Sequence, residues 1–299
     1  MNLNTAKGAT APTYPYAADL AVLLPAFETL VDEIVSSGLS RDALGRALDT
    51  GMTEVTSVLR AVPAAEGKLL ERGIALVAGR NPDLVVLTQN LRLPVTRAAS
   101  ELVEMNEPSL YRSLSLDADS GGRKTYTPDL LILNKRTEVA HLVDVKRSLG
   151  SYELSRIAEL KNRMLAAALV VPDLLYKEHR RLRTKEVRVV ILNAENQRAD
   201  IDGGIWPLSH LDHLLEVAGA GEAMAHLREL FQSQVEENWS AALVGRRDAG
   251  LPTSTAGKAG KTPTLHCDED NVCGSDGASS IARLPVSIGF ARAPRAASP

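Results

Sequence analysis

The stretch that decides the fold covers residues 128–146 and reads PDLLILNKRTEVAHLVDVK. Two runs rich in Leu, Ile and Val flank the polar segment NKRT at 134–137, which has the composition of a tight turn. Residues of this kind favour strands, and a short turn joins strands that run antiparallel. The stretch therefore predicts a β-hairpin.

Two carboxylates and a lysine lie at one end of this predicted hairpin. Residues two apart on a strand share a face, so Asp144 and Lys146 should project together while Val143 and Val145 point into a core on the other face. Asp129 begins the neighbouring strand, and the fourteen residues between it and Asp144 suit two strands of about five residues and a turn. Counting back from the turn brings the two aspartates close together.

An acidic residue two positions before a lysine also occurs elsewhere in the chain, at Glu66 and at Glu159. Both lie in helical patterns, where residues two apart diverge by about 200° around the axis. Only Asp144 and Lys146 have this spacing of an acidic residue and a lysine on a strand of the hairpin.

The chain upstream of the hairpin is mainly helical in pattern. Apolar residues recur every three or four positions over 19–62, which predicts two amphipathic helices, and a third helix is expected over about 63–78. The segment 81–106 is ambiguous, because DLVVL suits a short strand and VTRAASELVEM suits a helix. At 111–119, YRSLSLDAD has a period of two and is expected to complete a three-stranded meander with the hairpin.

Downstream, a helix is expected over about 152–171, a strand over 186–195 and further helices to about 244. The predicted order is helix, three strands, helix, strand, helix, which indicates an α/β core with a mixed sheet. We expect a disordered N-terminus at 1–18, a helical extension at 19–62, the core at 63–195, a helical extension at 196–244, and a disordered tail, rich in Gly, Ala, Pro and Ser, at 245–299.

Composition narrows the class of protein. Hydrophobic residues make up 44% and charged residues 24% of 299, which is ordinary for a globular protein. No run reaches the about 20 apolar residues that span a bilayer, and the first residues lack an apolar leader, so we expect no membrane partner and a cytoplasmic location. The two cysteines lie in the polar tail, and a reducing compartment is the simpler interpretation.

A net charge of −3 means that any binding of nucleic acid must come from a local patch. The segment KEHRRLRTKEVR at 177–188 offers one, since six Lys or Arg against two Glu leave +4 with its histidine neutral. The alternative is a solvated loop or helix end. The same two interpretations hold for basic residues on the helix after the hairpin. The residues expected to contact phosphates are Arg156, Lys161, Arg180, Arg181 and Arg183.

With Pro128 and Asp129, a hairpin, and then Asp144, Val145 and Lys146, the chain resembles the PD-(D/E)XK nuclease superfamily. The resemblance covers roughly residues 63–195, rests on a short motif, and implies a restriction-endonuclease-like core of order αβββαβ. It implies that Asp129, Asp144 and the carbonyl of Val145 bind Mg²⁺ or Mn²⁺, with Lys146 near the attacking water. It also implies a carboxylate from the preceding helix, for which Glu71 is the first expectation and Glu66 the second.

These residues predict a metal-dependent nuclease that hydrolyses phosphodiester bonds, with DNA as the expected substrate and direct attack by water. Asp144 and Lys146 have a plainer interpretation as a strand ion pair, which contributes about 0–1 kcal/mol. The alternative function is a nucleic-acid-binding or regulatory protein that keeps a nuclease fold without its chemistry. A blunt double-strand cutter would need two active sites, hence a homodimer.

Overall fold

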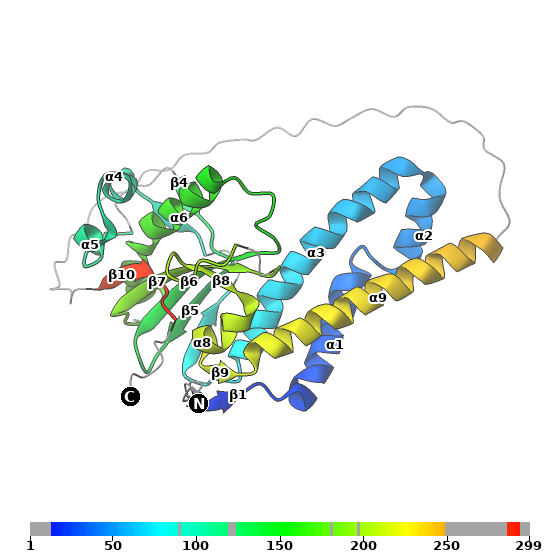
Figure 1. Cartoon of the computed structure of the whole chain (residues 1–299), viewed down its shortest axis with the longest axis horizontal. Coiled ribbons are helices and arrows are strands. Elements are labelled where there is room, and N and C mark those ends of the chain that lie inside the picture. The colour runs from blue at the N-terminus through cyan, green and yellow to red at the C-terminus, as the bar shows by residue number, and fades with distance from the viewer. Residues whose placement is uncertain are drawn as a thin grey trace, which may run out of the picture.

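One mixed β-sheet organises the part of the chain that the computed structural model describes, which is residues 13–88, 91–118, 124–179, 182–195, 198–248 and 286–293, without the side chains of 108, 109 and 246–248. Its strands lie in the order β10-β7-β6-β5-β2, with β8 also paired to β7 (Figure 1). Their bounds are β2 Leu84–Leu87, β5 Leu130–Asn134, β6 Val139–Lys146, β7 Glu186–Asn193, β8 Ile205–Pro207 and β10 Ser287–Phe290.

The predicted hairpin is confirmed. Strands β5 and β6 are antiparallel, with Leu130 opposite Val143. The Asn134 side chain accepts hydrogen bonds from the backbone N–H groups of Arg136 and Thr137, at 2.9 and 3.1 Å, which fixes the turn. The hydrogen bonds of the turn and the alternation of apolar residues in the two strands thus favour the same pairing register.

The third strand of the meander is β2, so the prediction of a strand at 111–119 is wrong. Residues 111–118 follow the short helix α5 (Pro108–Tyr111) as an irregular segment. This segment is held by helical neighbours instead of a sheet ladder, since Leu116 N–H donates to the Leu169 carbonyl and Ala118 N–H donates to the Asp173 carboxylate. The DLVVL segment does form a strand. Along the chain β3, α4, α5 and β4 come between β2 and β5, and α6 and α7 come between β6 and β7, so the expected order of helix, three strands, helix and strand is interrupted.

Helices cover both faces of the sheet (Figure 1). The helices α1 (Leu20–Ser36), α3 (Met52–Ala78), α8 (Leu211–Leu215) and α9 (Ala220–Asp248) pack with alternate strand residues such as Leu130, Val143 and Val190. The helices α4 (Arg97–Met105), α6 (Leu154–Ala168) and α7 (Val171–Glu178) pack with the others, such as Leu131, Leu142 and Ile191. The short strands β3 (Leu93–Val95) and β4 (Lys124–Tyr126) pair beside the second face.

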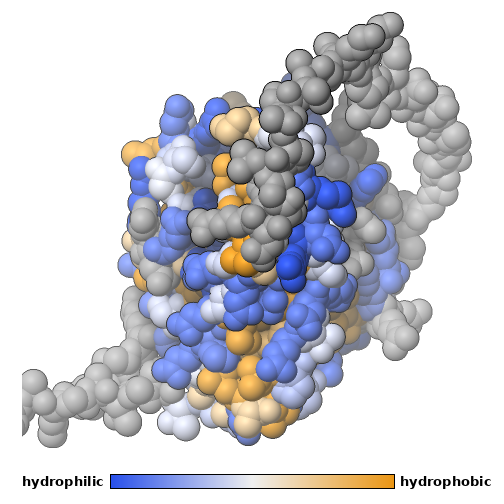
Figure 2. Space-filling view, turned by 90° about the vertical axis from the view of Figure 1, so that its right-hand side faces the viewer, coloured by the Kyte–Doolittle hydropathy of each residue, from blue (hydrophilic) through white to orange (hydrophobic). Residues whose placement is uncertain are grey.

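The helices α1, α2 (Arg41–Thr50), α3 and α9 form a helical arm that extends beyond the sheet (Figure 1). The expected helix boundary at Pro63 is wrong, because α3 runs through Pro63 and the break falls at Gly51, whose φ of 112° only glycine adopts easily. Figure 2 faces the arm and shows a band of apolar side chains between hydrophilic ones. No described helix is long and apolar enough to cross a membrane.

Two segments that were expected to be disordered contain strands. Strand β1 (Tyr16–Ala17) pairs in parallel with β9 (Val217–Ala218), and β10 from the predicted tail pairs in parallel with β7. Strand β10 is anchored by burial, as for Ile288 at 2% exposure, whereas the half-buried Tyr16 and exposed Ala17 of β1 are held by pairing with β9; the local composition reveals neither partner. The rest of both segments, apart from 13–18, 245–248 and 286–293, lies outside the described residues.

Candidate active site

The end of the β5–β6 hairpin brings the two predicted aspartates together. Continuing the register one step beyond Leu130 and Val143 places Asp129 opposite Asp144. An Asp129 carboxylate oxygen accepts a hydrogen bond from Val145 N–H at 2.6 Å, which holds this side chain against β6. Asp144 is only 4% exposed, so its charge is shielded from water.

Asp144 is engaged on both carboxylate oxygens. Lys146 forms an ion pair with Oδ1, and the Tyr126 hydroxyl donates to Oδ2 at 2.8 Å. Burial and the charge of Asp144 raise the pKa of Tyr126, so this hydroxyl keeps its proton and acts as the donor. The Arg163 guanidinium lies 5.7 Å from the centre of the Tyr126 ring and adds a positive group behind it.

Glu71 on α3 is electrostatically coupled to this cluster. Burial raises its pKa to about 7, and the negative charges of Asp129 and Asp144 act in the same direction. Burial also raises the pKa of Asp129, with the charge of Asp144 as the second cause. Three carboxylates that repel one another in this way, with Lys146 as the counter-charge, form a site that favours added positive charge.

Glu66, the second expectation for the helix carboxylate, has a different role. It is 6% exposed, and its Oε1 accepts hydrogen bonds from two nitrogens of Arg228 at 2.7 and 3.0 Å. Arg228 also donates to the carbonyl of Ala194 at 3.0 Å. Glu66 therefore ties α3 to α9 and to the end of β7, which leaves Glu71 as the helix carboxylate that is coupled to the aspartates.

The donor set suits a hard divalent cation in chemistry, because Mg²⁺ and Mn²⁺ prefer oxygen ligands and the carboxylates repel one another. The positions of these groups fit a metal ion less well. Within the described ranges, no three carboxylate, imidazole or thiolate groups are gathered so that they could hold a metal ion as they stand. Lys146 supplies the positive charge at Asp144 in this arrangement, so a cation on Asp144 requires the ammonium group to move aside.

The basic residues predicted on α6 divide into two kinds. Arg156 is exposed, as a phosphate-binding residue would be. The Lys161 side chain is 18% exposed, lies 3.5 Å from a carboxylate oxygen of Asp200 and sits over the Phe290 ring, so it is already engaged. Arg163 lies over the ring of Tyr126, whose hydroxyl donates to Asp144.

The basic segment at 177–188 lies at the other end of the sheet from Lys146. Strands β6 and β7 are parallel, with Val139 opposite Glu186 and Lys146 opposite Asn193. The step from residue 139 to residue 146 spans about 23 Å at roughly 3.3 Å per residue. Arg183 is exposed at this distant end, and Arg180 and Arg181 lie outside the described residues. The structure thus does not bring Arg183 to the carboxylates.

Sequence reasoning missed two polar residues of the site. Tyr126 comes from β4, which lies outside the predicted meander. Asn193 is fully buried, stands opposite Lys146 and shares its face of the sheet. The only signal for Asn193 in the sequence is its place as a polar residue at the end of the apolar run VVIL.

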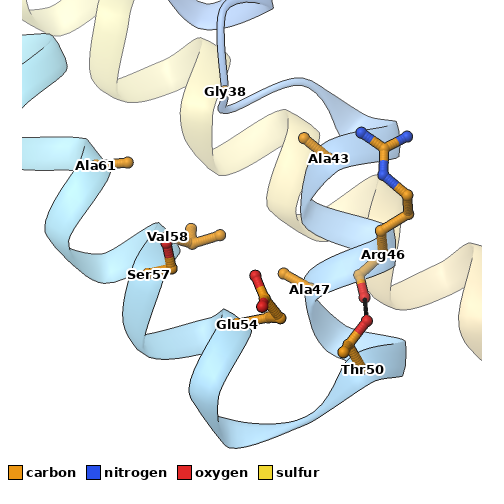
Figure 3. Close-up of a pocket in the computed structure, with 9 residues that line it drawn as sticks. All are labelled: Gly38, Ala43, Arg46, Ala47, Thr50, Glu54, Ser57, Val58 and Ala61. Carbon is orange, nitrogen blue, oxygen red and sulfur yellow. Dashed lines mark hydrogen bonds between the residues drawn. The ribbon is translucent and has the colours of Figure 1, made fainter. Parts of the chain in front are cut away.

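A hollow of about 460 Å³ lies elsewhere, between α2 and α3 of the helical arm. Figure 3 shows Ala47 and Val58 across from each other, with Glu54 pointing between the two helices. Its lining is mainly small side chains and contains no convergent set of reactive groups. The carboxylate cluster on the hairpin therefore remains the candidate site.

Comparisons of the chain with protein-family models, with curated proteins and with solved structures found no match. The functional argument therefore rests on the site itself.

Proposed function

We propose that this chain is a divalent-metal-dependent nuclease of the PD-(D/E)XK type that hydrolyses phosphodiester bonds in DNA. The observation that carries the proposal is the convergence of Asp129, Asp144 and Lys146 on one end of a hairpin, with Glu71 coupled to them from the preceding helix. The sheet order β7-β6-β5-β2, with α3 before β2 in the chain and α6 after β6, supports a restriction-endonuclease-like core.

Lys146 acts as a cation in this proposal. Burial on its own would lower the pKa of Lys146, but the charges of Asp144 and Asp129 outweigh that effect and raise it. The side chain therefore carries its proton at neutral pH and serves to orient water and to offset negative charge on the phosphate, not to accept a proton.

Glu71 is a metal ligand in this proposal. Its pKa is raised to about 7 in the metal-free site, and a divalent cation beside it would favour loss of that proton and the ionised form that serves as a ligand. Asp129, Asp144, Glu71 and the carbonyl of Val145 are the groups that would hold Mg²⁺ or Mn²⁺. When bound, such an ion lowers the pKa of a water ligand and neutralises charge on phosphoryl oxygens.

The second candidate is a nucleic-acid-binding or regulatory protein with this fold and no hydrolytic chemistry. It is favoured by the engagement of both Asp144 oxygens, one by Lys146 and one by Tyr126. On this view Asp144 and Lys146 stabilise the sheet, and binding of nucleic acid is independent of divalent ions.

The test is cleavage of supercoiled plasmid and of labelled single strands by the purified full chain with Mg²⁺ or Mn²⁺, and with EDTA. Asp144→Asn removes the charge under test, and Glu159→Gln is the matched control, because Glu159 also precedes a lysine by two positions but is exposed on α6. Nicking that needs the metal, disappears in Asp144→Asn and persists in Glu159→Gln supports the nuclease. DNA binding without cleavage under any of these conditions favours the second candidate.

A further inference from the structure

The free edge of the sheet contains a second polar site, a hollow of about 230 Å³ that we call the arginine pocket. Figure 1 shows β10, which forms one of its walls, at the edge of the sheet away from the helical arm. Three distant parts of the chain line the pocket: the residue after α5, the start of β7, and β10 with the residues that follow it. Its charged members are Arg112, Arg188, Arg292 and Glu186.

Backbone hydrogen bonds hold these three parts together. Strand β10 pairs with β7, with Ser287 opposite Glu186 and Gly289 opposite Arg188. On its other side, Ile288 N–H donates to the carbonyl of Arg112 at 2.5 Å. The pocket is therefore built by secondary structure and does not depend on the chance approach of long side chains.

The pocket has an excess of positive charge. Three guanidinium groups against one carboxylate leave a net charge of +2. Glu186 forms an ion pair with Arg188 at 2.9 Å, and in the described part of the chain neither Arg112 nor Arg292 has an ion-pair partner. Two guanidinium groups at one hollow with no carboxylate of their own attract an anion.

The lining at Gly289 is open. A Cβ atom at this position would have no heavy atom of the described residues within 4 Å, and the residue lies in a strand, where any side chain is allowed by the backbone. The absence of a side chain keeps space free between the arginines. A larger residue at 289 would occupy that space without displacing other parts of the protein.

We propose that the arginine pocket binds a phosphate group. The planar guanidinium matches two phosphate oxygens at once, which favours phosphate over a chloride ion or a single carboxylate oxygen. The volume is below the about 300–1,000 Å³ typical of sites for whole small molecules, so a single phosphate fits better than an entire nucleotide. The phosphate belongs either to a small free phosphate compound or to the backbone of a nucleic acid.

This site is separate from the carboxylates and does not depend on the proposed nuclease activity. Its lining contains none of Asp129, Asp144, Lys146 or Glu71, and Arg188 lies five residues before Asn193 on β7, roughly 17 Å away along the strand. Binding can therefore be measured in EDTA, where loss of metal-dependent cleavage has no influence on the result.

The experiment is titration of the full chain with inorganic phosphate and, separately, with a short oligonucleotide, in EDTA and by calorimetry. The test variants are the double substitution Arg112→Gln/Arg292→Gln, and Gly289→Val, which fills the hollow and leaves every charge in place. Gly289→Ala is a milder filling variant, and thermal unfolding checks that each one folds. Arg60→Gln, an exposed arginine on α3, is the matched control.

We expect phosphate affinity to fall about tenfold or more in the double variant and in Gly289→Val, and to stay unchanged in Arg60→Gln. A parallel loss of oligonucleotide affinity identifies the phosphate as that of a nucleic-acid backbone, whereas unchanged oligonucleotide affinity identifies a small phosphate compound. Phosphate binding that is absent in the native chain, or that survives both the charge and the filling variants, overturns the proposal.

Discussion

The Asp144 side chain is buried and depends on Lys146 for its counter-charge. Removal of one partner of a buried ion pair leaves an uncompensated charge, whereas removal of both leaves a neutral site. We therefore expect Lys146→Met to lower the free energy of unfolding by about 3 kcal/mol or more, and Asp144→Asn/Lys146→Met to recover a large part of that loss. Urea denaturation at pH 7 measures both. If the double variant is as unstable as the single one, the pair is not coupled in this way.

Glu71 predicts a pH dependence of stability. Its pKa in the folded protein is raised from an ordinary value of 4.5 to about 7, first by burial and then by Asp129 and Asp144. The folded state therefore holds this proton more tightly than the unfolded state does, and the resulting stability is complete below pH 4.5 and is lost as the pH rises through 7.

We expect the native chain to lose on the order of 1–2 kcal/mol relative to Glu71→Gln between pH 5 and pH 8, less than the full pKa shift implies because Glu71 is only half-buried. The measurement is the free energy of unfolding of both proteins across this range, without divalent ions. Parallel pH profiles would show that Glu71 titrates normally.

At the scale of elements, the hairpin could be predicted because everything that fixes it is local. The turn at 134–137 and the period of two lie within twenty residues, and they set the opposition of Asp129 and Asp144. Glu71 was expected from the resemblance, with Glu66 as the second expectation, and its electrostatic coupling to the two aspartates is what the structure adds.

The elements that were missed depend on partners far away in the chain. Strand β10 is ordered by β7, about one hundred residues earlier, and residues 111–118 are held by the connection between α6 and α7. Tyr126 reaches Asp144 from a strand outside the expected meander, so its role could not be inferred from spacing. The period of apolar residues indicates which secondary structure a segment can form. Which strand it pairs with is set by the assembled sheet.

The contact between α3 and α9 allows a comparison of two ion pairs on the same helix. Arg228 and Glu66 are largely buried, with side-chain exposures of 22% and 8%, whereas Arg72 and Glu33 are exposed at 47% and 60%. We expect Arg228→Met to cost about 3 kcal/mol, because the buried Glu66 loses both hydrogen bonds from Arg228 and keeps only the longer contact with Arg147 at 3.9 Å, and Arg72→Met to cost less than about 1 kcal/mol.

Urea denaturation of the two variants at neutral pH makes this comparison directly. Equal costs would mean that water reaches Glu66 and replaces the lost hydrogen bonds. The Arg228 variant also removes a contact next to the candidate site. Arg228 donates to the carbonyl of Ala194, and the N–H of Ala194 donates to the carbonyl of Lys146.

At the scale of the whole molecule, charge is distributed between two ends of one sheet. The carboxylates gather where β6 ends, while the arginine pocket and the basic segment before β7 lie where β7 begins. A chain with a net charge of −3 can thus present a locally positive surface, because its acidic and basic groups are separated along parallel strands. The helical arm shares one continuous core with the sheet, so α1, α3 and α9 are part of the same folding unit as the site.

Because the sheet and the helical arm share one core, metal binding at the site should be measurable as a change in the stability of the whole chain. Three carboxylates face one ammonium group at the hairpin end, so a divalent cation that binds only the folded chain should stabilise all of it. At about 100 times its dissociation constant, such an ion adds about 2.7 kcal/mol, which raises the midpoint of thermal unfolding by several degrees. We expect this rise with Mg²⁺ or Mn²⁺ in the native chain and in Glu159→Gln, its reversal by EDTA, and its loss in Asp144→Asn and in Asp129→Asn. A rise of the same size in all four proteins would place the bound ions elsewhere on the surface, and no rise in any of them would favour the ion pair of Asp144 and Lys146 as the final state of the site.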